Sequence, residues 1–347
     1  MKNKDSIFQF HIVITLIIIL IFLMAISMNK SRNMPIETYL AGLPINSMPV
    51  KLEEGQNNAD VFGRGPESKI CSGNQCENCQ CDIKYPITIK EYEYNGKTFK
   101  VIRDDLLEVG TKQRVAKNYC TYLVAHSETP ITHLLYTGTY NGFGPVALAW
   151  GANQINIKAT VVLSLEPVGY GKKLTKELAE LTKNVKLCRK YGAEVLFVNN
   201  WKEINQMGAK LSEQEGWYWV PLGFDDETFI RCLAYDLTKC INLDNQDEIS
   251  NLNGSNIWMV GGSGTIARAY SLAYPNSTIY LIPAILKQIN KLENKCKKYK
   301  NIKIIQHHSK KLIAPYPTVE NYDSIAWDTA VALGKTGDYI LNVASFE

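Results

Sequence analysis

The sequence predicts an α/β protein with mostly parallel strands flanked by helices, preceded by a membrane-spanning helix near its N-terminus. From residue 85 onward, short apolar runs alternate with helix-like stretches, an order typical of parallel sheets covered on both faces. Two loops rich in small residues follow such runs and precede helices. A single long uncharged run near the N-terminus predicts the membrane helix. The 46% hydrophobic content fits a globular core, and a net charge of +4 is too mild to indicate a nucleic-acid partner.

Residues 8–28 form the predicted transmembrane helix. Residues 12–28 carry no charge and are dominated by Ile and Leu, and the whole run is long enough to cross a bilayer. Basic residues flank both ends, so they do not fix the orientation. A cleavable signal peptide is the competing interpretation, but the run is long for one and the site at Ala25 to Ser27 is poor. We therefore expect an uncleaved, single-pass anchor behind a short tail, residues 1–7.

Residues 29–84 form a polar connector rich in Asn, Pro, Gly and Ser, without periodicity. It contains four closely spaced cysteines: Cys71, Cys76, Cys79 and Cys81. Their spacing matches no standard zinc or iron–sulfur pattern, and two local disulfides are slightly favoured over a weak candidate metal site. The other cysteines fall in apolar helical patterns and are predicted to be buried thiols: Cys120, Cys188, Cys232, Cys240 and Cys296.

Residues 85–347 form the predicted enzyme-like domain. Strands are expected at residues 134–137, 160–163, 195–198, 217–220, 257–260, 278–282 and 302–305. Ligands bind such sheets beyond the carboxyl ends of the strands. The loops at 138–142 and 261–265 both follow strands, so they are expected to face one cleft. The Lys-rich stretch 287–303 is predicted to be an exposed helix face.

The stretch 101–114 places a lysine at the start of a helix. A strand-like run ends at Asp104 and Asp105, a turn follows at residues 108–110, and Lys112 begins the helix. The apolar positions recur at i, i+4, i+7 and i+8: Val115, Tyr119, Tyr122 and Leu123. Positive potential at a helix N-terminus lowers the pKa of an amine, which suits a lysine that reacts in its neutral form. Taken alone, Lys112 is more simply read as a solvated surface residue.

The loop at 261–265 has the composition of an anion-binding turn. Gly261, Gly262 and Gly264 let backbone N–H groups approach a phosphate, and Ser263 and Thr265 add hydroxyls at a helix N-terminus. Residues 262–267 also fit the dinucleotide pattern G-x-G-x-x-A. That pattern needs an acidic residue near the end of the next strand, where residues 281–284 read LIPA. A tight turn that binds nothing also remains open.

Taken in order, the helix-start lysine, the asparagine turn and the Gly/Ser loop resemble fold-type II pyridoxal-phosphate enzymes, the tryptophan synthase beta-like superfamily. The nearest branch is that of D-cysteine desulfhydrase and 1-aminocyclopropane-1-carboxylate deaminase. Its K-R-x-D-L and G-N-K-x-R elements are matched here by IRDDL and GTKQR. The resemblance extends from about residue 85 to the C-terminus. It implies two lobes, each with a mostly parallel sheet flanked by helices, pyridoxal 5'-phosphate as cofactor, and a small amino acid as substrate.

The resemblance also implies roles for individual residues. Lys112 would form the internal aldimine and then act as general base. The phosphate would lie on the loop from Gly261 to Thr265, Asn141 would contact the 3′ oxygen of the ring, and Ser345 could offer its hydroxyl to the ring nitrogen. Three residues around Asn141 would receive the substrate: Thr139, Tyr140 and Gly142.

Three departures from the branch alter the expectation. Thr111 replaces an asparagine, Tyr140 replaces a catalytic serine, and residues 342–345 replace a glycine-rich end. The leading hypothesis is a membrane-anchored lyase, deaminase or desulfhydrase in which Lys112 and Tyr140 take part in catalysis. The alternatives are a catalytically impaired binding relative and a nucleotide-binding oxidoreductase that uses residues 262–267. A homodimer is left open.

Overall fold

The structure, a computed structural model, describes residues 85–167, 172–239, 251–307, 312–319 and 322–345. All of them lie within one compact unit, Asp82–Glu347. The predicted anchor, the connector with Cys71, Cys76, Cys79 and Cys81, and Cys240 lie outside the described residues. Within that part of the chain, no helix is both long and apolar enough to cross a membrane. No group of His, Cys, Asp and Glu side chains there could hold a metal ion.

The larger of two sheets has six strands in the order β1-β2-β10-β7-β8-β9. The strands are β1 (Ile89–Tyr94), β2 (Lys97–Arg103), β7 (Asn256–Gly261), β8 (Thr278–Pro283), β9 (Ile302–Ile304) and β10 (Tyr339–Asn342). Only β1 runs antiparallel to its neighbour; the other pairs are parallel. β10 lies between β2 and β7, with Ile340 opposite Val101 on one side and Trp258 on the other. The last strand in sequence therefore joins the first hairpin to the rest of the sheet.

The smaller sheet has four parallel strands in the order β5-β4-β3-β6. These are β3 (His133–Thr139), β4 (Lys158–Ser164), β5 (Glu194–Val198) and β6 (Trp217–Trp219). Every strand predicted from an apolar run is present, with ends shifted by at most two residues. The α/β class and the parallel pairing are thus confirmed, while β1 and β10 were not among the predicted strands.

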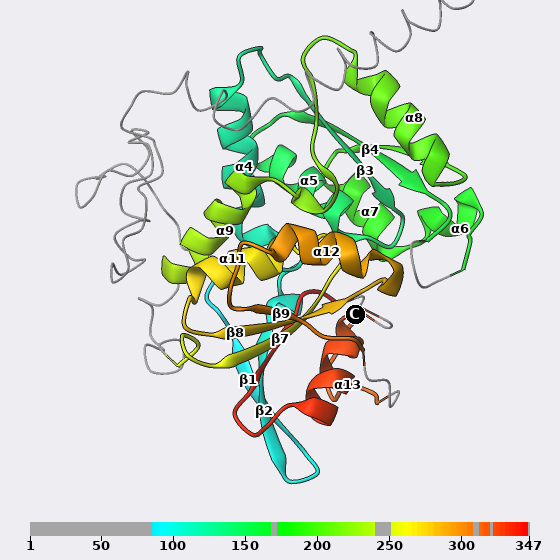
Figure 1. The fold of residues 1–347 in the computed structure, drawn as a ribbon. Helices are drawn as coiled ribbons and strands as arrows, with labels where there is room; N and C mark the ends of the chain where they lie inside the picture. Colours follow the sequence, from blue (N-terminus) through cyan, green and yellow to red (C-terminus); the bar gives the residue numbers. More distant parts are fainter. Residues whose placement is uncertain (1–84, 168–171, 240–250, 308–311, 320–321, 346–347) are drawn as a thin grey trace, which may run out of the picture. The chain divides into compact units, whose positions relative to one another are not determined.

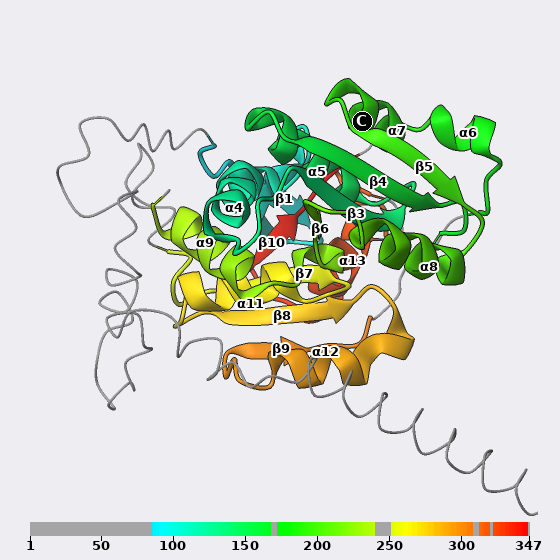
Figure 2. The same ribbon diagram turned by 90° about the horizontal axis from the view of Figure 1, so that it is seen from above.

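Helices cover both faces of the six-stranded sheet (Figures 1 and 2). α13 (Asp323–Leu333) packs on the face that carries Trp258 and Val260. α11 (Thr265–Ala273) and α12 (Ile289–Cys296) lie on the opposite face, where Leu292 approaches Leu281 around Gly264. The alternation along β8 connects the two faces: Ile282 packs in the core with α13 and the adjacent Leu281 lies by Leu292 of α12, because successive side chains of a strand point to opposite faces.

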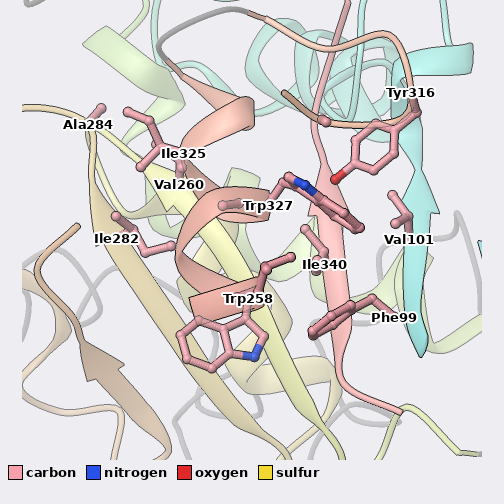
Figure 3. Close-up of a cluster of buried hydrophobic side chains, with 14 residues drawn as sticks. Phe99, Val101, Trp258, Val260, Ile282, Ala284, Tyr316, Ile325, Trp327 and Ile340 are labelled. Atoms are coloured by element: carbon pink, nitrogen blue, oxygen red, sulfur yellow. The ribbon is translucent and has the colours of Figure 1, made fainter. Parts of the chain in front are cut away.

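Aromatic side chains fill the core between α13 and the sheet (Figure 3). Trp327 is fully buried and meets the ring of Phe99 edge-on at 5.7 Å between centroids. The ring of Tyr316 contacts Trp327 in the same way, also at 5.7 Å. Edge-to-face and offset-stacked pairs are both favoured over a direct face-to-face arrangement of aromatic rings. This packing fixes α13, whose first residue enters the candidate site described below.

The four-stranded sheet is also covered on both faces. α8 (Trp201–Ser212) packs Ile204 against Leu135 and Val162 on one face. α5 (Phe143–Gln154) and α7 (Lys183–Lys190) contact each other and the strands of this sheet. α9 (Glu227–Lys239) contacts both α4 (Gln113–His126) and α11. The remaining short elements are α6 (Lys176–Glu180), η2 (Asp104–Leu106), η3 (Leu222–Phe224) and η5 (Leu286–Gln288).

Some side chains differ from the sequence prediction. Tyr122 is 36% exposed and stacks on His126 rather than facing the core, because Ala116 and Cys120 complete the buried stripe of α4. The cysteines that the structure describes are free thiols; all are buried except Cys232, which is half-buried. Most lysines of the stretch 287–303 are exposed, as predicted, and Lys295 is half-buried.

Candidate active site

Lys112 lies at the carboxyl ends of β2 and β10, in the turn that leads into α4. It directly precedes the first residue of the helix rather than standing inside its first turn. The turn is pressed against the end of β10, where a Cβ at Gly110 would lie 2.5 Å from the carbonyl oxygen of Val343. The Thr111 N–H donates to the same oxygen at 3.0 Å. Gly110 has φ +72, so glycine suits both the close approach and the backbone.

Two ion pairs hold this turn in place. Arg114 donates to Asp104 across 2.6 Å, and both side chains are essentially excluded from solvent. Arg103 binds both oxygens of Asp105 at 2.7 Å. These four residues are the charged positions of IRDDL and GTKQR, apart from the lysine itself. The two motifs therefore fold together into the support on which Lys112 stands.

Lys112 shares its surroundings with a buried carboxylate, Asp323, at the start of α13. Burial lowers the pKa of Lys112 to about 8, and the charge of Asp323 opposes that shift. Burial raises the pKa of Asp323 to about 8, although the amides of Val343 and Ala344 favour its ionised form. Neither oxygen of Asp323 has a partner within hydrogen-bonding geometry among the described residues. The sequence predicted a lowered lysine pKa from the helix terminus, whereas burial is its main cause.

The sequence analysis did not single out Asp323. An aspartate in the first turn of a helix is ordinary, because the helix dipole favours a negative charge there. Only tertiary packing shows that this carboxylate is 1% exposed and lies beside a lysine. No local pattern in the sequence carries that information.

The asparagine loop connects the end of β3 to α5. After Thr139, the chain turns through Tyr140 and Asn141, and the Gly142 N–H donates to the Thr139 carbonyl at 3.0 Å. The Tyr140 hydroxyl donates to the carbonyl of Lys172 at 2.9 Å, and burial raises the pKa of this phenol. The buried Asn184 donates to the Gly142 carbonyl at 3.0 Å and braces the loop from α7.

The glycine loop connects the end of β7 to α11. Gly264 has φ +75 and precedes the first residue of the helix. The hydroxyls of Ser263 and Thr265 lie 2.8 Å apart. No atom lies within 4 Å of the position that a Cβ would take at Gly262. The loop therefore presents backbone and hydroxyl donors beside open space, as an anion-binding turn requires.

Contacts between the loops show that they surround one region. A Cβ at Gly223 in η3 would lie 2.6 Å from the Ser263 hydroxyl, so η3 touches the glycine loop. The Gly223 N–H donates to the Tyr136 hydroxyl at 2.8 Å. That phenol lies against Gly144, two residues after the asparagine loop. The expectation that both loops face the same region is therefore supported by a continuous chain of contacts.

The N-terminal end of α13 connects Lys112 to this region. Tyr322, directly before Asp323, is near enough to the Gly262 amide for that amide to oppose the rise that burial causes in its pKa. The structure thus brings together Lys112, the glycine loop and the first turn of α13. Ser345 is buried just beyond β10, and its carbonyl accepts from Lys183 at 3.3 Å. Tyr322, Asp323 and Asn184 are the site residues that the sequence did not indicate.

Solved structures share this fold. An ACC deaminase homologue matches with a TM-score of 0.54 at 16% identity, over 76% of this chain and 90% of that one. A hydrogen sulfide-producing enzyme from Fusobacterium nucleatum gives 0.54 at 12% identity, over 75% and 93%. A pyridoxal 5'-phosphate-dependent aspartate racemase gives 0.51 at 15% identity, over 75% and 90%.

No protein-family model and no curated protein matches the chain. At identities of 12 to 16%, the structural likeness establishes the fold and nothing finer. That fold is the tryptophan synthase beta-like fold, which the three sequence motifs predicted.

Proposed function

We propose that the chain is a pyridoxal 5'-phosphate-dependent enzyme of the lyase, deaminase or desulfhydrase type that acts on a small amino acid. One observation supports this above the others. Lys112, with a lowered pKa, lies near the buried carboxylate of Asp323 in a region bounded by the glycine loop. Each of the three features suits one part of the cofactor: its aldehyde, its ring nitrogen and its phosphate.

The residues present fit the cofactor. The space beside Gly262 leaves room for a phosphate next to the Ser263 and Thr265 hydroxyls. Asn141 would lie beside the ring. Two groups are candidates for the ring nitrogen, the Ser345 hydroxyl from the sequence analysis and the Asp323 carboxylate from the structure. When bound, pyridoxal phosphate supplies an electron sink for negative charge at the substrate α-carbon.

The chain itself would hold and move protons around that group. Lys112 is the residue that would bind the cofactor covalently, because a neutral amine is the nucleophile and its lowered pKa makes that form accessible near neutral pH. Once released, the same Nζ would accept the α-proton of the substrate. Asp323 would keep a proton on the nitrogen that it faces. A buried carboxylate suits that role, because pairing with a cation relieves the cost of its burial.

Tyr140 would shape the substrate side of the site. Its phenol is held by the Lys172 carbonyl, so it contributes bulk beside Asn141 rather than a free small hydroxyl. We therefore do not expect opening of the 1-aminocyclopropane-1-carboxylate ring, whereas elimination or racemisation remains compatible with the site. The same tethered phenol is the observation that favours a catalytically impaired binding relative as the second candidate.

Two tests separate these candidates. Pyridoxal phosphate added to the full-length chain should give an absorbance band at about 420 nm, and reduction with borohydride should fix the cofactor on Lys112. Lys112→Ala should lose both, whereas Lys117→Ala, an exposed lysine on the same helix, should keep both. A label on another lysine would refute the assignment. A band that no amino acid perturbs would leave the binding relative as the function.

A membrane-bound location completes the proposal. It rests on the uncharged run at residues 8–28, which precedes every residue of the candidate site.

A further inference from the structure

A cluster of one buried and two half-buried charged side chains lies directly behind the glycine loop. Its members come from three elements: Asp225 follows η3, Arg268 belongs to α11, and Lys295 belongs to α12. One oxygen of Asp225 binds the guanidinium of Arg268, and the other binds the ammonium of Lys295. The Arg268 side chain is only 9% exposed. A buried arginine of this kind is costly unless its donors are used.

Arg268 also donates to the glycine loop. Its Nε donates to the Gly264 carbonyl at 3.3 Å, and Nη2 donates to the Thr265 hydroxyl at 3.4 Å. Gly264 is the residue with φ +75, and its carbonyl also accepts the backbone N–H of Arg268 at 3.0 Å. The guanidinium therefore fixes the left-handed turn and the Thr265 hydroxyl together.

Arg268 also contacts the pair of hydroxyls in the glycine loop. The Ser263 and Thr265 hydroxyls lie 2.8 Å apart, and either could donate to the other. A guanidinium can only donate, so the Thr265 oxygen accepts from Arg268. The Ser263 oxygen also accepts the Thr265 N–H at 3.4 Å. Arg268 therefore helps to hold the two hydroxyls that lie beside the open space at Gly262.

Through Asp225, the position of Arg268 depends on the four-stranded sheet. Asp225 follows η3, which continues from β6 of the four-stranded sheet, whereas α11 and α12 belong to the six-stranded sheet. η3 touches the glycine loop a second time, through Gly223 and Ser263. Burial alone would raise the pKa of Asp225, but Lys295 and Arg268 outweigh that effect and hold it below its usual value. The carboxylate thus stays ionised and keeps Arg268 in place.

We propose that Arg268 is a positioning residue for the phosphate of the bound cofactor, and that Asp225 holds Arg268 against the glycine loop. The inference rests on the proposed function, because the phosphate in question is that of pyridoxal phosphate. Arg268 does not need to touch that phosphate. It acts through Gly264 and Thr265, whose backbone and hydroxyl do.

The test compares two ligands that differ only in the phosphate. The full-length chain, freed of cofactor, is titrated with pyridoxal 5'-phosphate and with pyridoxal, and covalent attachment is followed by absorbance. Arg268→Gln and Asp225→Asn should each weaken pyridoxal phosphate binding at least tenfold, equivalent to about 1.4 kcal/mol. Pyridoxal binding should stay within a few fold of wild type, because that ligand does not use the loop. Arg268→Lys should be intermediate, since an ammonium cannot make the same set of contacts.

Glu227→Gln is the matched control. Glu227 pairs with Lys298 at 3.3 Å, and so also links α9 to the end of α12, but it is exposed and does not reach the glycine loop. This substitution should leave the binding of both pyridoxal phosphate and pyridoxal unchanged. If Arg268→Gln fails to fold, Asp225→Asn alone decides the question, and pyridoxal binding reports whether each variant is folded.

The possible outcomes distinguish failure of the role assigned to Arg268 from failure of the proposed enzymatic function. A wild-type chain that binds neither ligand overturns the proposed function, and this inference falls with it. Binding of pyridoxal phosphate that is equally strong in wild type and in both variants overturns the inference alone. Equal weakening of both ligands also overturns it, because the cluster would then act on the fold rather than on the phosphate.

Discussion

At the scale of single residues, Lys112 and Asp323 act as a pair. Asp323 is buried and Lys112 is half-buried; desolvation moves the pKa of each to about 8, and each charge stabilises the other. Groups coupled this closely titrate together, so their midpoints belong to the pair. The direction for the lysine is nevertheless clear: above its pKa the amine is neutral and nucleophilic. Asp323 raises that pKa and therefore delays the neutral form as pH increases.

The first prediction concerns the pH dependence of covalent attachment. The rate at which the cofactor-free chain takes up pyridoxal 5'-phosphate should rise with pH, with a midpoint near 8. Asp323→Asn should move the midpoint to lower pH, because it removes the carboxylate that favours the ammonium form. Stopped-flow absorbance over a pH series measures both. A midpoint near 10 in wild type, or an upward shift in Asp323→Asn, would contradict the burial of the amine.

Part of this pair could be predicted from the sequence and part could not. Lys112 was identified because its neighbours form a motif along the chain, and the same motif supplies Asp104 and Arg114 for the turn. Asp323 lies more than 200 positions away and has no local motif. Its role depends on the packing of α13 against β10, which places it next to Val343 and Ala344. Residues whose role depends on long-range packing could not be predicted from the single sequence.

At the scale of elements, two of the three glycines in the glycine loop, Gly264 and Gly262, are required for different reasons. Gly264 has φ +75, and a Cβ there would lie 3.2 Å from Leu292 and 3.4 Å from Cys296. A residue without a side chain is needed at this position because φ is positive and α12 packs close by. Gly262 has no such constraint, and a side chain would enter only the open space that we assign to the phosphate. Gly264 is thus required by the fold, whereas Gly262 leaves the space that we assign to the phosphate.

The second prediction follows from that difference. Gly262→Val should fold with a free energy of unfolding within about 1 kcal/mol of wild type, but lose affinity for pyridoxal phosphate by roughly a hundredfold or more, because it blocks two or three charge-assisted hydrogen bonds. Gly264→Val should lose about 2 kcal/mol of stability through backbone strain. Urea denaturation and cofactor titration separate the two effects. Normal cofactor affinity in a folded Gly262→Val variant would mean that the loop is only a turn.

The third prediction concerns the ion pair that supports the lysine turn. Asp104→Asn removes the nearer of the two carboxylates that pair with the buried Arg114 guanidinium and leaves only Asp236 at 3.8 Å, which should cost about 3 kcal/mol in the free energy of unfolding. The exposed pair of Glu180 and Arg189 is the control, and Glu180→Gln should cost less than about 1 kcal/mol. Urea denaturation of the two variants tests this. Equal costs would show that the Asp104 pair does not anchor the turn.

At the scale of the whole molecule, the sequence predicted the layers but not their order. The apolar strands stood out because strands covered on both faces are continuously hydrophobic. β1 was not predicted because it is an edge strand with charged side chains, and β10 was not predicted although its four residues are all buried. The insertion of β10 between β2 and β7 joins segments more than 80 positions apart. The residues just after β10 also contact the candidate site, because the Val343 carbonyl accepts from Thr111 and the Val343 and Ala344 amides approach Asp323.

The last prediction concerns residues 8–28, which precede the folded unit. A helix of about 20 residues at 1.5 Å each spans a hydrocarbon core of about 30 Å, so this run should hold the chain in a membrane. The full-length protein should remain in the membrane pellet after a carbonate wash and keep its N-terminus. Replacing Ile18 with Asp and Ile19 with Arg puts two charges at the centre of the run, at a cost of about 2.5–3.5 kcal/mol each, and should release the protein. The released chain should still bind pyridoxal phosphate, because every residue of the candidate site lies beyond residue 100. A mature chain that begins near Met28 would instead establish a cleaved signal peptide.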